Sequence, residues 1–207
     1  MADSPIQLAV LISGAGATLQ NFIDRIADRT LNATIKLVVA SRSGIAGIER
    51  ARSAGLVCEI IERNKFATTA QFSAQVFGRC AAAGVDLICL AGWLSLLEIP
   101  PAMAGKIMNI HPALLPSFGG RGMYGRRVHQ AVLDHGCKVS GCTVHFVDQS
   151  YDNGPIILQR TCPVLDDDTA QTLANRVFEE EKIAYPAAIQ MYKGGRLRVE
   201  GRRVIGI

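Results

Sequence analysis

Residues 6–40, IQLAVLISGAGATLQNFIDRIADRTLNATIKLVVA, contain the pattern from which the fold class follows. An apolar run over 6–12 leads into a glycine-rich turn, an amphipathic segment over 17–27 and a second apolar run over 35–40. A short apolar run between turns is typical of a buried strand, so this order predicts a βαβ unit with parallel strands.

The same alternation continues up to residue 91. We expect helices over 45–54 and 69–83, and strands over 57–61 and 86–91. Phe72, Val76 and Cys80 recur every fourth residue, which is helical spacing. Strands that alternate with helices indicate an α/β protein with a mostly parallel sheet and flanking helices.

The second half of the chain has longer strands and a different order. We expect strands over 106–110, 139–148 and 155–164, a loop over 112–125, helices over 126–135 and 168–190, and a hairpin over 196–204. Thr169 offers good capping chemistry at the start of the last helix, and Pro186 is expected to bend or end it. The prediction is one Rossmann-like domain over 1–207, with an antiparallel C-terminal portion.

Composition excludes several classes of protein. The chain has 207 residues, 49% hydrophobic and 19% charged, which is ordinary globular composition. Its longest apolar uncharged run, 87–97, is too short for a membrane span, which needs about 20 residues. The N-terminus does not resemble a secretory signal. Six cysteines without a CxxC pair indicate reduced thiols, mostly buried, in a cytoplasmic protein.

The net charge of +4 is concentrated at the C-terminus. Residues 193–207 hold five Lys or Arg and one Glu, so the preceding residues sum to zero. A nucleic-acid-binding protein spreads a basic face over its body, so we expect no nucleic-acid partner. This charge distribution does not exclude a small anionic substrate.

The glycine-rich turn Ser13-Gly14-Ala15-Gly16-Ala17-Thr18-Leu19 lies between a predicted strand and a predicted helix. Backbone N–H groups at such a turn can bind an anion at the helix N-terminus. A dinucleotide fingerprint is incomplete, because Leu19 stands where its third glycine belongs. A pocket for one phosphate and a tight turn without a ligand both fit this segment.

Asn109 and His111 lie at the end of a predicted strand, in the stretch NIHPALLP. Alternate residues of a strand point to the same face, and open α/β sheets bind ligands beyond the carboxyl ends of their strands. An amide and an imidazole there could supply an oxyanion donor and a proton donor for acyl transfer. The alternative is a turn cap and a strand-end hydrogen bond.

Other polar residues carry weaker signals. Asp152 lies in the turn YDNGP, where a plain turn former is the simplest interpretation. His145 alternates with apolar residues and either faces the site or packs. His129 and His135 look like surface residues of a helix. No set of His, Cys and carboxylates has metal-ligand spacing, so we expect no metal.

Several stretches together resemble one enzyme family. They are LISGAGATLQNFID, DLICLAGWLSLL, NIHPALLP, SGCTVHFVDQSYDNGPIILQ and FEEEKIAYPAAI, in family order over about 8–204. The sequence resembles the phosphoribosylglycinamide formyltransferase family, folate-dependent enzymes of purine synthesis. The resemblance implies 10-formyltetrahydrofolate as cosubstrate, glycinamide ribonucleotide as acceptor and no metal.

The resemblance also implies roles for individual residues. The catalytic set would be Asn109, His111 and Asp152. The ribonucleotide would contact Gly16, Ala17 and Thr18 through its phosphate and Glu181 through its ribose. The folate would contact Thr69, Leu94, Ser95, Leu96, Leu97 and Asn109. A ribonucleotide-binding half over about 1–100 and a folate-binding catalytic half over about 101–207 would follow.

Two other classes of function remain open: a different enzyme on the same fold, and a nucleotide-binding module. A formyltetrahydrofolate deformylase, or an N-formyltransferase with another acceptor, would share the catalytic set. A module that binds NADP, with Arg42 after the second strand meeting the 2′-phosphate, is disfavoured by the missing third glycine. We expect small-molecule substrates, no membrane partner, and a monomer or homodimer.

Overall fold

In the computed structural model, which describes residues 4–206, the chain divides into two compact units. Unit 1 is Met1–Met108 and unit 2 is Asn109–Ile207. Each unit has its own sheet strands and its own buried apolar side chains.

Unit 1 contains four parallel strands in the order β3-β2-β1-β4. They are β1 (Ile6–Ile12), β2 (Ala33–Ala40), β3 (Cys58–Ile60) and β4 (Leu87–Leu90). Strand β1 pairs in parallel with β2 and β4, and β2 pairs in parallel with β3. This is the strand order of the first half of a doubly wound fold, and it confirms the predicted α/β class.

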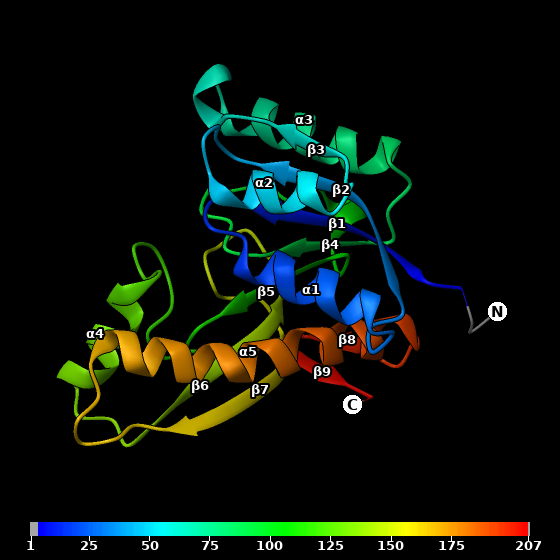
Figure 1. Ribbon diagram of the computed structural model, residues 1–207. Coiled ribbons are helices and arrows are strands. Elements are labelled where there is room, and N and C mark those ends of the chain that lie inside the picture. Colours follow the sequence, from blue (N-terminus) through cyan, green and yellow to red (C-terminus); the bar gives the residue numbers. More distant parts are fainter. Residues whose placement is uncertain (1–3, 207) are drawn as a thin grey trace. The chain divides into compact units, whose positions relative to one another are not determined.

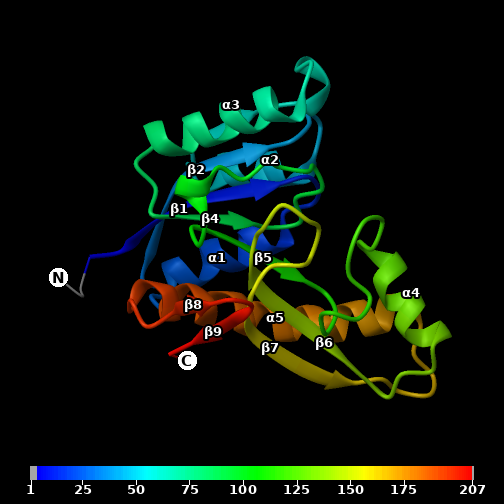
Figure 2. The ribbon, with the colours of Figure 1, turned by 180° about the vertical axis from the view of Figure 1, so that it is seen from behind.

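Helices cover both faces of this sheet. They are α1 (Ala17–Ala27), α2 (Ala46–Ser53) and α3 (Thr69–Ala82), with short 3-10 turns at Arg63–Lys65 and Pro101–Met103. Helices α1 and α2 lie on the near side in Figure 1, and α3 lies on the side that faces the viewer in Figure 2. The side chains of residues 8–12 are therefore fully buried, as expected of a central parallel strand.

Unit 2 is more antiparallel, and its strands follow the order β5-β6-β7-β9-β8. They are β5 (Ile107–His111, which begins at the end of unit 1), β6 (Val139–Phe146), β7 (Ile156–Pro163), β8 (Arg198–Glu200) and β9 (Arg203–Ile205). Strands β6 and β7 pair antiparallel, as do β8 and β9. Helix α5 (Ala170–Lys193) packs along β6 and β7 and also contacts α4 (Arg126–Asp134) (Figure 1).

Of the two effects expected of Pro186, a bend or an end of the last helix, the end is not found. Helix α5 begins after Thr169, whose hydroxyl accepts the Thr172 backbone N–H, and it continues through Pro186 to Lys193. A proline removes one helical hydrogen bond, but Tyr185 and Ile189 on either side of it are fully buried. Their packing outweighs the missing bond.

All six cysteines are free thiols, and Cys80, Cys89, Cys142 and Cys162 are buried as expected. Burial raises the pKa of the Cys80 and Cys142 thiols to about 12. Across the described residues no helix carries an apolar stretch long enough to cross a membrane.

Candidate active site

Three polar side chains of unit 2 converge where β5 ends. Asn109 and His111 are alternate residues of β5 and lie on the same face of the strand. Asp152 comes from the loop between β6 and β7. Its Oδ1 is 3.3 Å from Asn109 Nδ2, and its Oδ2 is 3.4 Å from His111 Nδ1. The structure therefore brings together the amide, the imidazole and the carboxylate that the sequence singled out.

The backbone of the Asp152 turn is held in an unusual conformation. Asp152 has a φ of 52°. This value lies in the left-handed region, which residues other than Gly rarely adopt. The turn packs tightly on the end of β6, because a Cβ on Gly154 would lie 1.8 Å from the Phe146 carbonyl oxygen. The Gly120 backbone N–H also donates to Asp152 Oδ2, at 2.9 Å. These contacts fix where the carboxylate points.

His111 is buried and has its tautomer set by its neighbours. Its Nε2 lies 2.8 Å from the carbonyl oxygen of Phe118, which can only accept, so Nε2 carries a proton. The second ring nitrogen, Nδ1, faces Asp152. Proton exchange by His111 therefore takes place at Nδ1.

His145, which the sequence left between packing and function, faces the site. Its Nδ1 donates to the Phe146 carbonyl oxygen at 2.8 Å, so its Nε2 is free to accept from Asn109 Nδ2 at 3.1 Å. Burial holds the pKa of His145 below its ordinary value, despite the opposing Asp152 charge. A neutral His145 thus orients the Asn109 amide.

Sequence reasoning missed the backbone groups of the loop over 112–125. Phe118 and Gly120 contribute a carbonyl oxygen and an N–H, which no residue type reveals. The one sequence signal for this loop is Gly119, which lies between these two residues. In the structure, a Cβ on Gly119 would lie 2.5 Å from Leu115 Cδ2 and 3.2 Å from Asp152 Cβ. A glycine is required there because the loop passes so close to Asp152.

The expectation that His129 is a surface residue is wrong. His129 is buried in α4, and its Nδ1 has no hydrogen-bond partner among the described residues. Burial, with a smaller contribution from His111, lowers the pKa of His129 to about 4. Helical spacing indicated the element, but the packing of α4 against α5 decided which face is covered. His135 is exposed as expected.

The glycine-rich turn of unit 1 adopts the geometry of a potential anion site. Gly16 is the N-cap of α1 with a φ of 73°, and no side chain caps the first N–H groups of the helix. Ala17 is exposed and Thr18 is buried. Upstream, the Ser13 hydroxyl accepts the Leu94 backbone N–H at 3.0 Å, which ties the turn to the segment 94–97.

Replacing Gly16 by Ala is expected to destabilise the protein by about 2–3 kcal/mol. The new Cβ would lie 2.8 Å from Gly47 Cα, and the left-handed φ adds strain. Gly14→Ala is the matched control, since its φ is not positive and a Cβ there meets nothing within 4 Å. Urea unfolding of both variants measures this, and equal stabilities would contradict the proposed packing of the turn.

Apart from Asn109, the residues expected to contact folate lie in two segments of unit 1. Thr69 is the first residue of α3, and its hydroxyl accepts from Arg63 at 3.1 Å. Leu94 and Leu96 are 44% and 39% exposed, whereas Leu97 is buried and Ser95 is half-buried. The exposed leucines form an apolar surface of the kind that an aromatic ligand needs.

Arg42, the residue considered for a 2′-phosphate, donates through its Nε to the Ser13 carbonyl oxygen at 3.0 Å. Its guanidinium therefore supports the glycine-rich turn. This contact gives no support to a dinucleotide site.

Glu181 lies on α5 of unit 2 and is half-buried. Burial raises the pKa of its carboxyl to about 7. A carboxyl group of this kind is suited to accept hydrogen bonds from hydroxyl groups of a bound ligand.

The raised pKa of Glu181 predicts a pH-dependent cost in stability. The folded state retains a proton that the unfolded state loses near 4.5, so stability falls as the pH rises from about 4.5 to about 7. Glu181→Gln is expected to gain stability over the native chain on the order of 2 kcal/mol at pH 8, and little at pH 4.5. The exposed Glu179, changed to Gln, is the control. An equal difference at both pH values, measured by urea unfolding, would count against this assignment.

Comparison with known proteins places the chain in a family. The formyl transferase family model matches residues 6–189. The chain belongs to the formyl transferase family. Its fold is similar to glycinamide ribonucleotide transformylase 1 from Symbiobacterium toebii, with a TM-score of 0.90 and 40% identity over 98% of this chain and 94% of that one. It is also similar to phosphoribosylglycinamide formyltransferase from Coxiella burnetii, with a TM-score of 0.89 and 31% identity over 98% and 93%.

The chain also matches parts of longer relatives. It is 40% identical over 196 residues to the trifunctional purine biosynthetic protein adenosine-3 of Gallus gallus, covering 94% of this chain and 19% of that one. It thus spans about a fifth of that relative's length. A formyltetrahydrofolate deformylase from Pseudomonas syringae has a TM-score of 0.85 but 20% identity, so that likeness shows the fold alone.

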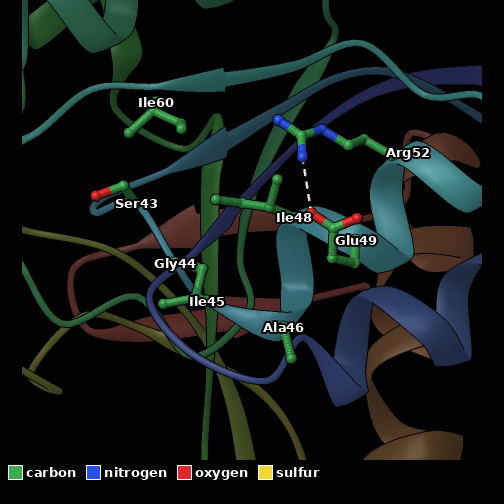
Figure 3. A pocket seen from close by; sticks show the side chains of 8 residues that line it. All are labelled: Ser43, Gly44, Ile45, Ala46, Ile48, Glu49, Arg52 and Ile60. Carbon is green, nitrogen blue, oxygen red and sulfur yellow. Dashed lines mark hydrogen bonds and ion pairs between the residues drawn. The ribbon is translucent and has the colours of Figure 1, made fainter.

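Unit 1 has a separate hollow of about 500 Å³ beside α2. Figure 3 shows Ile45, Ile48 and Ile60 around it, with an ion pair between Arg52 and Glu49 at 2.7 Å. None of the predicted site residues lines it. Within residues 4–206, no three side chains of His, Cys, Asp or Glu are grouped as a metal site requires.

Proposed function

We propose that this chain transfers the formyl group of 10-formyltetrahydrofolate to the amine of glycinamide ribonucleotide, the third step of de novo purine synthesis. The observation that carries the proposal is the cluster of Asn109, His111 and Asp152 at the end of β5. Solved relatives with 40% and 31% identity over nearly their whole length carry names for this activity.

The reaction joins the amine nitrogen of the ribonucleotide to the formyl carbon and then breaks the bond from that carbon to the folate nitrogen. The tetrahedral intermediate carries an oxyanion, which Asn109 stabilises by donating from Nδ2 and protonated His111 by donating from Nδ1. The Asn109 amide holds His145 at 3.1 Å and Asp152 at 3.3 Å. In the intermediate, the Asn109 N–H that faces Asp152, the more distant of these two acceptors, donates to the oxyanion instead.

Two protons must move. One leaves the attacking nitrogen, and another reaches the departing folate nitrogen. Asp152 faces Nδ1 of His111, so it can orient the ring and pass a proton to or from it, directly or through water. The proton on Nε2 stays hydrogen-bonded to the Phe118 carbonyl oxygen, and this bond keeps the ring in place.

The remaining assignments belong to the same proposal. Gly16, Ala17 and Thr18 hold the phosphate through the N-terminus of α1, and Glu181 binds the ribose. Folate contacts Thr69, Leu94, Ser95, Leu96, Leu97 and Asn109. We further propose one domain over 1–207, with the ribonucleotide phosphate bound in a half over about 1–100 and the catalytic residues in a folate-binding half over about 101–207. The folate extends from there to the contacts at 69 and 94–97 of the first half. It acts without a metal, in the cytoplasm, as a monomer or homodimer and with no nucleic-acid or membrane partner.

Acceptor dependence tests the proposal. The purified protein is incubated with 10-formyltetrahydrofolate, with and without glycinamide ribonucleotide, and tetrahydrofolate release is followed. We expect release only when the ribonucleotide is present. Release without it would replace the proposal with a deformylase, and no release in either case would show that the substrates are different.

A further inference from the structure

The basic C-terminal segment has no role in the proposed reaction, yet the structure places it beside the Asp152 turn. Strands β8 and β9 form a hairpin whose two-residue turn is Gly201-Arg202, with a φ of 61° at Gly201. Strand β9 pairs in parallel with β7 at Arg203 and Ile156. Because Ile156 is the first residue of β7, this pairing brings Arg202 to the turn that precedes β7.

Arg202 holds the residue that follows Asp152. Its Nη2 donates to the Asn153 carbonyl oxygen at 2.9 Å, and its Nη1 lies 3.5 Å from Asn153 Oδ1. On its other side, Asn153 Nδ2 donates to Asp148 Oδ2 at 2.8 Å. The main chain and the side chain of Asn153 are therefore both anchored, and the main-chain anchor comes from the distant hairpin.

Such an anchor matters because Asp152 has a left-handed backbone. That conformation is less favourable than a right-handed one for a residue with a Cβ. Asp tolerates it better than most residues, but contacts from the surroundings still decide whether it persists. If the Asn153 carbonyl oxygen were released, the turn could relax to a negative φ at Asp152. Its carboxylate would then swing away from Asn109 and His111.

We infer that Arg202 is a positioning residue, whose guanidinium holds the Asp152 turn in the conformation that presents the carboxylate to His111. The inference rests on the proposed function, because it assigns Arg202 an effect on the reaction that Asp152 assists. Arg202 itself touches neither His111 nor Asn109 through any hydrogen bond or ion pair that the structure shows within residues 4–206.

A double-mutant cycle tests the inference in the full chain. Arg202→Gln is expected to lower kcat about 3- to 10-fold, with KM for the ribonucleotide unchanged, because the bond is charge-assisted but exposed. In an Asp152→Asn background the same change is expected to have no further effect. Arg203→Gln removes one charge from the same hairpin and is expected to retain the native rate. Arg202→Met is a second uncharged variant, to be used if the Gln variant does not fold.

The outcomes separate the inference from the function on which it rests. A native rate for Asp152→Asn, or no formyl transfer by the native chain, would contradict the proposed function. If Asp152→Asn is slow but Arg202→Gln matches Arg203→Gln, the positioning role is wrong. It is equally wrong if Arg202→Gln slows both backgrounds by the same factor, because that is the behaviour of a merely structural contact.

Discussion

Replacing His111 by Ala is expected to lower kcat for formyl transfer by about 100- to 1000-fold, the usual cost of losing an oxyanion donor. His111 also carries the proton that its Nδ1 exchanges beside Asp152, so no neighbouring group substitutes for it. His145 cannot, because its two nitrogens are already bonded to the Phe146 carbonyl oxygen and to Asn109. Steady-state rates at saturating concentrations of both substrates measure the loss.

The control for this variant is Gln130→Ala, an exposed residue of α4 in the same unit. It is expected to retain the native kcat within about 2-fold, since surface substitutions change little. Thermal melting of both variants shows whether the fold persists. A folded His111→Ala variant with nearly native kcat would remove His111 from the mechanism.

The second large effect is expected at Asn109. Asn109→Ala removes the amide that donates to the oxyanion and leaves His145 Nε2 and Asp152 Oδ1 without that donor. We expect kcat to fall by about 100- to 1000-fold, again through the lost oxyanion donor. Because the side chain is only half-buried and forms no part of the apolar core, the variant is expected to fold.

Asn175 provides the matched control for Asn109. It is an exposed asparagine on α5 whose amide oxygen accepts from Gln171, and Asn175→Ala is expected to leave kcat unchanged. If Asn109→Ala retained more than about a tenth of the native kcat, the oxyanion would need another donor. The Gly120 backbone N–H, already next to Asp152, would then be the group to examine.

Local sequence patterns predicted most of the elements. Strand β1 and helix α1 begin and end at the predicted residues, because an uninterrupted apolar run and a glycine-rich turn define their limits. The alternation of Asn109 and His111 correctly placed both side chains on one face of β5. Pro186 does not end α5, because the buried packing of that helix is a tertiary effect that a residue type does not reveal.

The parts of the site that the sequence did not predict depend on contacts between distant segments. By its local pattern Asp152 looked like a plain turn former, and only the family resemblance assigned it to the catalytic set before the structure placed its carboxylate beside β5. The Phe118 carbonyl oxygen and the Gly120 N–H are backbone groups, so no side chain announces them. In the sequence, Arg202 was one of several basic residues of the C-terminal segment 193–207. Only the pairing of β9 with β7 brings it to its partner, the Asn153 carbonyl oxygen.

The most direct test of the proposed chemistry follows the formyl carbon itself. The native chain in slight excess over 10-formyltetrahydrofolate labelled at that carbon is mixed with glycinamide ribonucleotide, and the products are identified by mass spectrometry after a single turnover. We predict that the label appears in the ribonucleotide together with tetrahydrofolate, and that the His111→Ala variant forms no such product in the same time. Label released as formate, or transferred equally fast by the variant, would contradict the account.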